Sequence, residues 1–156
     1  MKSLVVYYSR TGKTKFAAET IAAQLSADIE EIVDQKKRAG PIGWLNAGKA
    51  ATREETTKIA SLKYLPANYD LIVLGTPVWA WRPTPAIRTY IKQSDLAAKK
   101  VAFFLTSDGD PKQAAERTKA LFSNSIFTGE LSLISPLKDK ESTEKRITEW
   151  CDILKQ

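Results

Sequence analysis

Short, uninterrupted apolar runs alternate with amphipathic stretches along this chain, and that alternation constrains its fold more than any other feature. Residues 4–8, 71–74 and 101–105 are apolar throughout, and two weaker runs lie at residues 29–33 and 126–134. Between these runs, apolar side chains recur at the three- and four-residue spacing of a helix that buries one face. Strands that are apolar on both faces are typical of a parallel sheet covered by helices on both sides. We therefore expect an α/β fold whose five-stranded parallel sheet is doubly wound.

The size and composition of the chain indicate one domain and chemistry that comes from a cofactor. Its 156 residues suffice for a single domain with a sizeable core, and we expect residues 1–156 to form it. The sequence contains one cysteine, Cys151, and no histidine. A lone cysteine cannot form an internal disulfide, and without histidine there is neither a Ser-His-Asp triad nor a histidine proton shuttle. We therefore predict no catalytic side chain and no metal site, and assign any chemistry to a bound cofactor.

The chain is basic, with a net charge of +6 and basic clusters at residues 36–38, 99–100 and 145–146. No motif that reads RNA or DNA accompanies these clusters, so we expect no nucleic-acid binding. A solvated face is the first interpretation of the charge, and steering of an anionic small molecule or an acidic partner is the second. No apolar run approaches the length of a signal sequence or a membrane span, so we expect a cytoplasmic protein without membrane contact. The sequence does not indicate an oligomeric state.

A polar loop with one glycine lies between the first expected strand and the first expected helix. The helix-like stretch runs from Phe16 to Leu25, and the loop before it offers hydroxyls beside the open N–H groups of a helix N-terminus. A helix N-terminus carries a partial positive charge, which favours a bound phosphate. We predict a phosphate-binding loop formed by Ser9, Arg10, Thr11, Gly12, Lys13 and Thr14.

Two other interpretations of this loop compete with phosphate binding. Gly12-Lys13-Thr14 looks like the end of an ATP-binding P-loop, but that motif needs a glycine five residues earlier, where the chain has Tyr7. A helix cap without a ligand is the second interpretation, in which Ser9 or Thr11 accepts a backbone N–H. Such a cap accounts for one hydroxyl but not for three.

Further helix signals and one long crossover complete the pattern. Thr84 and Asp110 each precede a proline, and a capping residue followed by proline is typical of a helix start. The last helix places Trp150 and Cys151 on its apolar face, where we expect both to be buried. The crossover at residues 35–59 is longer than one connecting helix needs, and we expect a helix within it.

Three loops, each after one of the expected strands, together resemble the flavodoxin family over essentially the whole chain. The first is Ser9–Thr14, the second runs from Gly75 to Ala86, and the third from Thr106 to Asp110. In an open α/β sheet, ligands bind outside the carboxyl ends of the strands, where the strand order reverses. The resemblance implies the sheet order 2-1-3-4-5. It also implies non-covalently bound FMN, with the phosphate at the first loop and the flavin ring at the second.

The resemblance further implies which residues of the second and third loops contact the flavin. Trp79 is the best candidate for stacking on the ring, Trp81 is the second and Trp44 a weaker third, with packing against the helix after Thr84 as the alternative for the first two. Asp108 is expected near the pyrimidine side of the ring, where its charge would lower the reduction potential. The residues of these two loops that we expect at the cofactor are Thr76, Pro77, Val78, Trp79, Ala80, Trp81, Ser107, Asp108 and Gly109.

Two features depart from the family pattern. Many members have asparagine where this chain has Lys13. The Lys13 side chain either adds a cation to the phosphate loop or points to solvent, and we expect the second. Typical electron-carrying flavodoxins are acidic, whereas this chain is basic. The second departure puts the usual partners in question but not the cofactor, because FMN itself is anionic.

Three functions fit the sequence. The resemblance implies an electron carrier that exchanges electrons with redox partner proteins through bound FMN. An FMN-dependent NAD(P)H or quinone reductase is the alternative, because the basic surface and the long crossover can both shape a substrate site. A flavin-free regulatory or anion-binding module is the second alternative. In the first two cases we expect the partner or substrate to be acidic or anionic.

Overall fold

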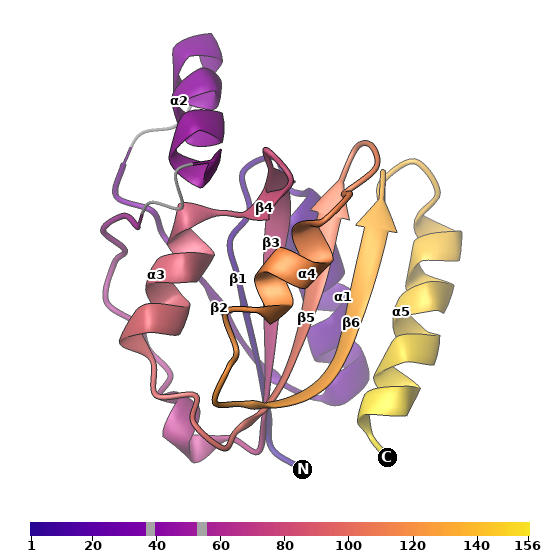
Figure 1. Cartoon of the computed structure of the whole chain (residues 1–156). Helices are drawn as coiled ribbons and strands as arrows, with labels where there is room; N and C mark the ends of the chain where they lie inside the picture. The colour runs from indigo at the N-terminus through magenta and orange to yellow at the C-terminus, as the bar shows by residue number, and fades with distance from the viewer. Residues whose placement is uncertain (37–39, 53–55) are drawn as a thin grey trace.

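A parallel sheet forms the centre of the molecule (Figure 1). The computed structural model describes residues 1–36, 40–52 and 56–156, apart from the side chains at positions 41, 44 and 50–52. The sheet has the order β2-β1-β3-β5-β6, and a two-residue strand, β4, pairs antiparallel with β3. The predicted order 2-1-3-4-5 is confirmed, because the predicted fourth and fifth strands are β5 and β6. The strands are β1 (Ser3–Tyr7), β2 (Asp28–Glu31), β3 (Leu71–Trp79), β4 (Arg82–Pro83), β5 (Lys100–Ser107) and β6 (Ile126–Ile134).

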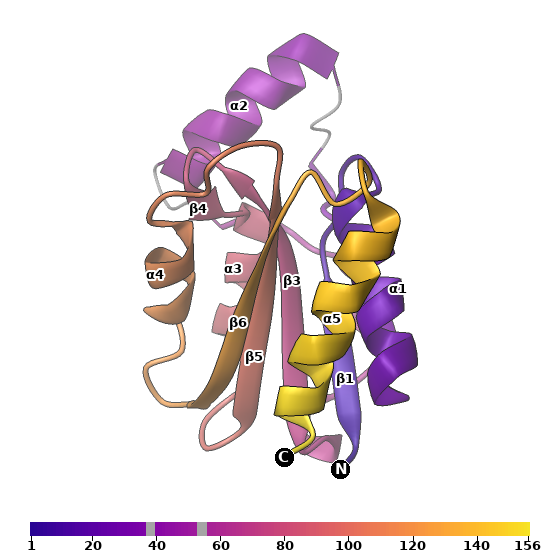
Figure 2. The same ribbon diagram turned by 90° about the vertical axis from the view of Figure 1, so that its right-hand side faces the viewer.

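Helices cover both faces of the sheet. Figures 1 and 2 show α1 (Lys13–Leu25) and α5 (Lys140–Leu154) on one face, and α3 (Pro85–Gln93) and α4 (Ala114–Lys119) on the other. Strand side chains alternate between two buried clusters: Val5 belongs to the cluster under α1 and α5, and Leu4 to the cluster under α3 and α4. The central strands β1, β3 and β5 are therefore buried on both faces, which explains the continuous apolar runs of the sequence at residues 4–8, 71–74 and 101–105. Trp150 and Cys151 lie in the first cluster, as predicted.

Strand β3 is longer than the sequence predicts. Residues 75–79 belong to the second predicted loop, but they continue the strand through Trp79. Val78 and Trp79 are β-branched and aromatic, and such residues favour extended backbone. The turn that follows contains only Ala80 and Trp81, which have positive φ values of 49° and 56°. The predicted loop is therefore a tight hairpin between β3 and β4.

The two predicted helix starts have different outcomes. Thr84 precedes α3 as predicted, but its side chain does not cap the helix and instead shares a hydrogen bond of 3.1 Å with the hydroxyl of Thr76. The prediction for Asp110 is wrong: its carboxylate accepts the N–H of Lys112 at 2.8 Å, and α4 begins only at Ala114. Aspartate often bonds to backbone two residues further on, and this local turn competes with helix capping.

The long crossover carries α2 (Gly40–Thr52), so the prediction of a helix there is confirmed. α2 extends beyond the carboxyl ends of the strands and lies against β3 and β4 (Figures 1 and 2). The segments on either side of it are joined to each other, since Gln35 donates its N–H to the carbonyl of Lys58 at 2.9 Å and Ala60 donates to Val33 at 3.0 Å. No helix in the described part of the chain is long and apolar enough to cross a membrane.

A 3-10 helix, Pro66–Asn68, leads from the crossover into β3. Of the basic cluster at residues 36–38, positions 37 and 38 lie outside the described residues, as does the side chain of Trp44.

Candidate functional site

The three predicted loops meet at the carboxyl edge of the sheet. The loop after β1 leads into α1 on one face, and the hairpin after β3 leads into α3 on the other, so the chain diverges between these neighbouring strands. Such a divergence opens a crevice where ligands of α/β proteins bind. A cleft of about 320 Å³ lies there, and its lining residues are Arg10, Thr11, Lys13, Thr14, Pro77, Val78, Trp79, Thr106, Ser107 and Asp108.

Most of the predicted cofactor residues therefore gather in one cleft, and Thr106 is a lining residue that the site prediction missed. Thr106 ends the apolar run of β5, and a polar residue at that position is the signal that could have identified it. The predicted residues that do not line the cleft are Ser9, Gly12, Thr76, Ala80, Trp81 and Gly109.

Ser9 closes the first loop onto the start of α1. Its Oγ accepts the N–H groups of Gly12 and Lys15, both at 3.2 Å. Gly12 precedes the helix with a φ of 92°, a left-handed conformation that glycine adopts without steric cost. The Ser9 hydroxyl thus acts as the helix cap that the sequence offered as an alternative to ligand binding. The N–H groups of Lys13 and Thr14, also in the first turn of α1, take no part in these bonds.

Thr14 and Thr106 connect the first loop to β5. Their hydroxyl oxygens lie 2.7 Å apart, so either hydroxyl donates to the other. Both residues are buried, with exposed fractions of 1% and 2%. A pair of mutually bonded hydroxyls can still donate its second hydrogen or accept through its remaining lone pairs. The floor of the cleft next to α1 is therefore polar and preorganised.

Trp79 forms the apolar wall of the cleft. Its ring packs edge to face on Tyr8, with centroids 5.6 Å apart, and is 9% exposed. The guanidinium carbon of Arg10 lies 5.7 Å from the centre of the same ring. Trp79 is therefore held by packing on one side and remains part of the cleft lining on the other.

Trp81 lies at the tip of the β3–β4 hairpin and outside the cleft. It is 47% exposed, and the ammonium of Lys112 lies 4.0 Å from the centre of its ring. Arg117 of α4 donates to the carbonyl of Trp81 at 3.1 Å. The two tryptophans, two residues apart, thus have different surroundings: Trp79 is a wall of the cleft, and Trp81 is an exposed ring that contacts Lys112 while its backbone carbonyl binds Arg117.

Lys13 and Asp108 form an ion pair between the first and third loops. The expectation that Lys13 points to solvent is wrong, because its ammonium bonds to a carboxylate 95 residues away in the sequence. Asp108 remains 70% exposed, so water screens the pair. Ser107 donates to the carbonyl of Gly109 at 2.7 Å and keeps the third loop compact.

The family of the chain follows from a comparison with protein-family models. The model described as flavodoxin matches residues 2–154. The chain belongs to the flavodoxin family. The fold, the strand order and the position of the cleft are those expected for it. A search of curated proteins found no match.

Several solved structures share this flavodoxin-like fold. A provisionally named flavoprotein from Bacteroides eggerthii is 26% identical with a TM-score of 0.80, and the match covers 99% of this chain and 98% of that one. A flavoprotein from Lactobacillus acidophilus, solved in complex with FMN, is 24% identical with a TM-score of 0.75, over 88% of this chain and 96% of that one. A flavodoxin from Streptococcus pneumoniae is 16% identical with a TM-score of 0.63, over 99% and 97% of the two chains.

The single cysteine of this flavodoxin-family chain lies away from the cleft. Cys151 is fully buried in α5, and burial raises the pKa of its thiol to about 11. The thiolate is the reactive form of cysteine, and at neutral pH it is a negligible fraction here. Cys151 is therefore a core residue and not a reactive group of the site.

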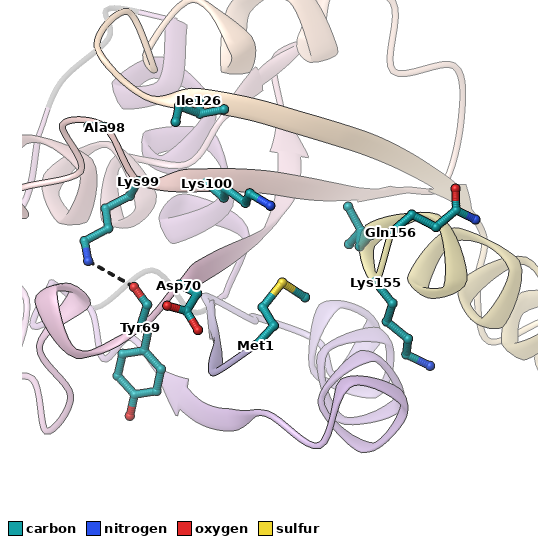
Figure 3. Close-up of a pocket in the computed structure, with 10 residues that line it drawn as sticks. Met1, Tyr69, Asp70, Ala98, Lys99, Lys100, Ile126, Lys155 and Gln156 are labelled. Carbon is teal, nitrogen blue, oxygen red and sulfur yellow. Dashed lines mark hydrogen bonds between the residues drawn. The ribbon is translucent and has the colours of Figure 1, made fainter.

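A larger cavity, of about 580 Å³, lies at the opposite edge of the sheet (Figure 3). Lysines line it, but the ammonium of Lys99 donates to the carbonyls of Ala67 and Tyr69, both at 3.0 Å, and Figure 3 shows the second of these bonds. Lys155, another lining residue, pairs with Asp152 at 3.2 Å. This cavity is at the amino ends of the strands, and Lys99 and Lys155 already have protein partners, so we assign the candidate site to the smaller cleft.

Proposed function

We propose that the carboxyl-edge cleft binds FMN non-covalently and that the protein transfers electrons through it. One observation carries the proposal: a helix N-terminus beside buried hydroxyls and a tryptophan wall share a single cleft at the point where β1 and β3 diverge. FMN has a dianionic phosphate, which suits the helix N-terminus and the hydroxyls, and a large planar ring, which suits the tryptophan wall. Membership of the flavodoxin family and the FMN-bound neighbour with the same fold support FMN as the cofactor.

The lining residues divide into two groups by what they would do for FMN. The start of α1 and the hydroxyls of Thr11 and Thr14 would hold the phosphate through hydrogen bonds to its oxygens. Trp79 would pack on the ring and exclude water from it, and its edge-to-face contact with Tyr8 helps to hold the indole in place. FMN, when bound, supplies one- and two-electron transfer. The chain positions the cofactor and sets the charge and polarity around it.

A reductase remains the second candidate, and the position of α2 favours it. α2 lies over the same edge of the sheet as the cleft, and Ala47 of this helix belongs to the same buried cluster as Trp79. A helix at that place can bound a substrate site next to the flavin. The substrate would then be NAD(P)H or a quinone, and in either function an anionic or acidic partner suits the basic chain.

Reconstitution with FMN tests the proposal. We expect the protein to turn yellow when FMN is added, to quench FMN fluorescence, and to bind riboflavin much more weakly than FMN. Stoichiometric anaerobic reduction without turnover of NAD(P)H supports the carrier, and NAD(P)H oxidation with a quinone acceptor supports the reductase. A protein that binds no FMN at micromolar concentrations would contradict both and favour the flavin-free module.

A further inference from the structure

The charges that line the carboxyl-edge cleft do not balance. Among the lining residues that the structure describes, Arg10 and Lys13 are cations and Asp108 is the one carboxylate. Lys13 and Asp108 form an ion pair, so their charges largely cancel for anything bound in the cleft. The charge of Arg10 is left over, because a guanidinium stays protonated at every physiological pH. The cleft therefore has a net positive charge that belongs to one residue.

Arg10 lies next to the wall on which a planar ring would pack. Its guanidinium carbon is 5.7 Å from the centre of the Trp79 ring, and both side chains line the cleft. The Nη1 atom of Arg10 is buried and has no hydrogen-bond partner among the described residues. The indole face stabilises the positive charge but cannot accept the in-plane hydrogen bonds of a guanidinium. A ring that packs on Trp79 would therefore meet a charged donor that still lacks an acceptor.

A cation at this place favours the reduced state of a flavin, because reduction adds negative charge to the ring. Salt and water screen exposed charges, but they screen a buried nitrogen such as Nη1 of Arg10 much less. A unit charge about 8 Å away, in an effective dielectric of about 20 to 40, changes the affinity for one added negative charge by roughly five- to thirtyfold. The phosphate of FMN is present in both redox states, so its binding does not produce such a difference.

We propose that Arg10 makes the cleft bind reduced FMN more strongly relative to oxidised FMN, and that it thereby raises the reduction potential of the bound cofactor. This inference rests on the proposed function, because it takes FMN as the ligand of the cleft. A flavin beside Arg10 accepts electrons more readily than the same flavin beside a neutral residue. This property suits a donor such as NAD(P)H, which transfers a hydride, two electrons and one proton, to the ring and leaves as NAD(P)⁺.

The affinities for FMN in its two redox states test the inference. The apoprotein is titrated with oxidised FMN and, without oxygen, with dithionite-reduced FMN, and the ratio of the two dissociation constants gives the shift in potential. Arg10→Gln removes the charge and should lower the preference for reduced FMN about tenfold. For a two-electron couple, this factor corresponds to a fall of about 30 mV in the reduction potential. Arg10→Lys keeps the charge and should stay close to the parent.

Two controls separate a charge at the ring from other roles of Arg10. Riboflavin has no phosphate, so Arg10→Gln should change its ratio of reduced to oxidised affinity by the same factor as for FMN. Arg146→Gln removes the same chemical group from the exposed face of α5, where Arg146 donates to the carbonyl of Ser132 at 2.9 Å, and should leave the ratio unchanged. Each ratio is taken within one variant, so a general loss of stability or affinity cancels from it.

Four results would overturn the inference. Equal losses of oxidised and reduced FMN affinity in Arg10→Gln would show that Arg10 acts on the phosphate or on packing, and the proposed function would stand. A shift seen with FMN but not with riboflavin would also place the charge at the phosphate. A ratio in Arg10→Lys as low as in Arg10→Gln would show that the charge is not the cause. A parent protein that binds neither flavin would overturn the proposed function and this inference together.

Discussion

The carboxyl and amino edges of this sheet are built from the same strands and both carry cations, yet they differ in what those cations do. At the amino edge, Lys99 donates to two backbone carbonyls and closes the structure around the start of β3. At the carboxyl edge, Arg10 has a buried nitrogen without an acceptor, beside the open start of α1. The larger cavity lies at the amino edge, and the buried Arg10 nitrogen belongs to a residue that lines the smaller cleft.

We therefore expect a buried charged donor without an acceptor to mark a ligand site better than cavity volume does. A cation whose donors are satisfied by the protein stabilises the fold and has little left for a ligand. A preorganised donor without an acceptor gains its bond only when a ligand arrives. Five predictions test this distinction, from the largest expected effect to the smallest.

Gly75 should be the most sensitive position beneath the carboxyl edge. A Cβ added there would lie 2.1 Å from Cζ of Phe104, whereas a Cβ at Gly109 in the third loop would meet open space. Because overpacking of a rigid core typically costs about 1–3 kcal/mol, Gly75→Ala should lower the free energy of unfolding by about that amount. Chemical denaturation of Gly75→Ala and Gly109→Ala measures the difference. Equal stability of the two variants would mean that Phe104 can move away freely.

Thr14, at the carboxyl edge, should contribute to FMN binding. Removal of its hydroxyl takes one donor from the phosphate site and leaves Thr106 without its partner. We expect Thr14→Val to weaken FMN by roughly tenfold or more, as for other hydrogen bonds to charged groups. Titration by flavin fluorescence measures this loss, with riboflavin as the control ligand. An unchanged ratio of FMN to riboflavin affinity would place the phosphate elsewhere.

Lys99, at the amino edge, should contribute to the free energy of unfolding and not to FMN affinity. Lys99→Met keeps much of the aliphatic chain but removes the donor to the carbonyls of Ala67 and Tyr69. Hydrogen bonds from charged groups contribute about 1.5–3 kcal/mol, and partial exposure reduces this, so we expect a loss of about 1 kcal/mol in the free energy of unfolding. FMN affinity should stay the same. A large fall in FMN affinity would contradict the division between the two edges.

Trp79 and Trp81 offer a comparison within the carboxyl edge. A tryptophan in contact with a flavin quenches its fluorescence, and the stacking contributes about 0.5–1.5 kcal/mol beyond area burial. Trp79→Phe should therefore raise the fluorescence of bound FMN severalfold, whereas Trp81→Phe should change it little because Trp81 lies outside the cleft. Time-resolved flavin emission measures both. A rise in Trp81→Phe alone would identify the hairpin tip as the stacking surface.

The Lys13–Asp108 pair should adjust the reduction potential by a small amount. Loss of Lys13 leaves a negative charge near the cofactor, and a charge on the order of 8 Å away in water-like dielectric contributes about 0.5 kcal/mol. For a two-electron couple this is about 10 mV, so Lys13→Gln should lower the potential of bound FMN by that amount at low salt. Asp108→Asn should raise it, and the double variant should return to the parent value. Equal shifts at low and high salt would mean that the pair acts by geometry and not by charge.

Local patterns in the sequence predicted the parallel sheet, most of the helices and the first loop of the cleft, whereas the resemblance to the flavodoxin family implied the sheet order and the contacts of the second and third loops. Continuous apolar runs such as residues 71–74 indicate buried parallel strands. A strand that is buried on both faces needs an apolar side chain at each successive position, so the signal lies in consecutive residues. Contacts across the sheet have no such local signal. Thr106 lies 92 residues from Thr14, and Asp108 lies 95 residues from Lys13, so only the folded chain shows that these side chains meet.

The hairpin after β3 shows a second limit of sequence patterns. Ala80 and Trp81 adopt positive φ, which propensity assigns to glycine or asparagine, and the turn forms there because the flanking strand pairs fix its ends. Asp110 failed as a helix cap for a related reason, since a carboxylate can bond to the nearest turn as readily as to a helix.

The chain segments before and after α2 are hydrogen-bonded to each other, so the segment between them can be replaced in protein engineering. Backbone hydrogen bonds between Val33 and Ala60, and between Gln35 and Lys58, hold the two chain segments that flank the helix together. Whatever is inserted between them begins and ends at one fixed place beside the cleft. A short turn or a foreign helix grafted at this place would change the surroundings of the cleft while the five-stranded scaffold kept its connections.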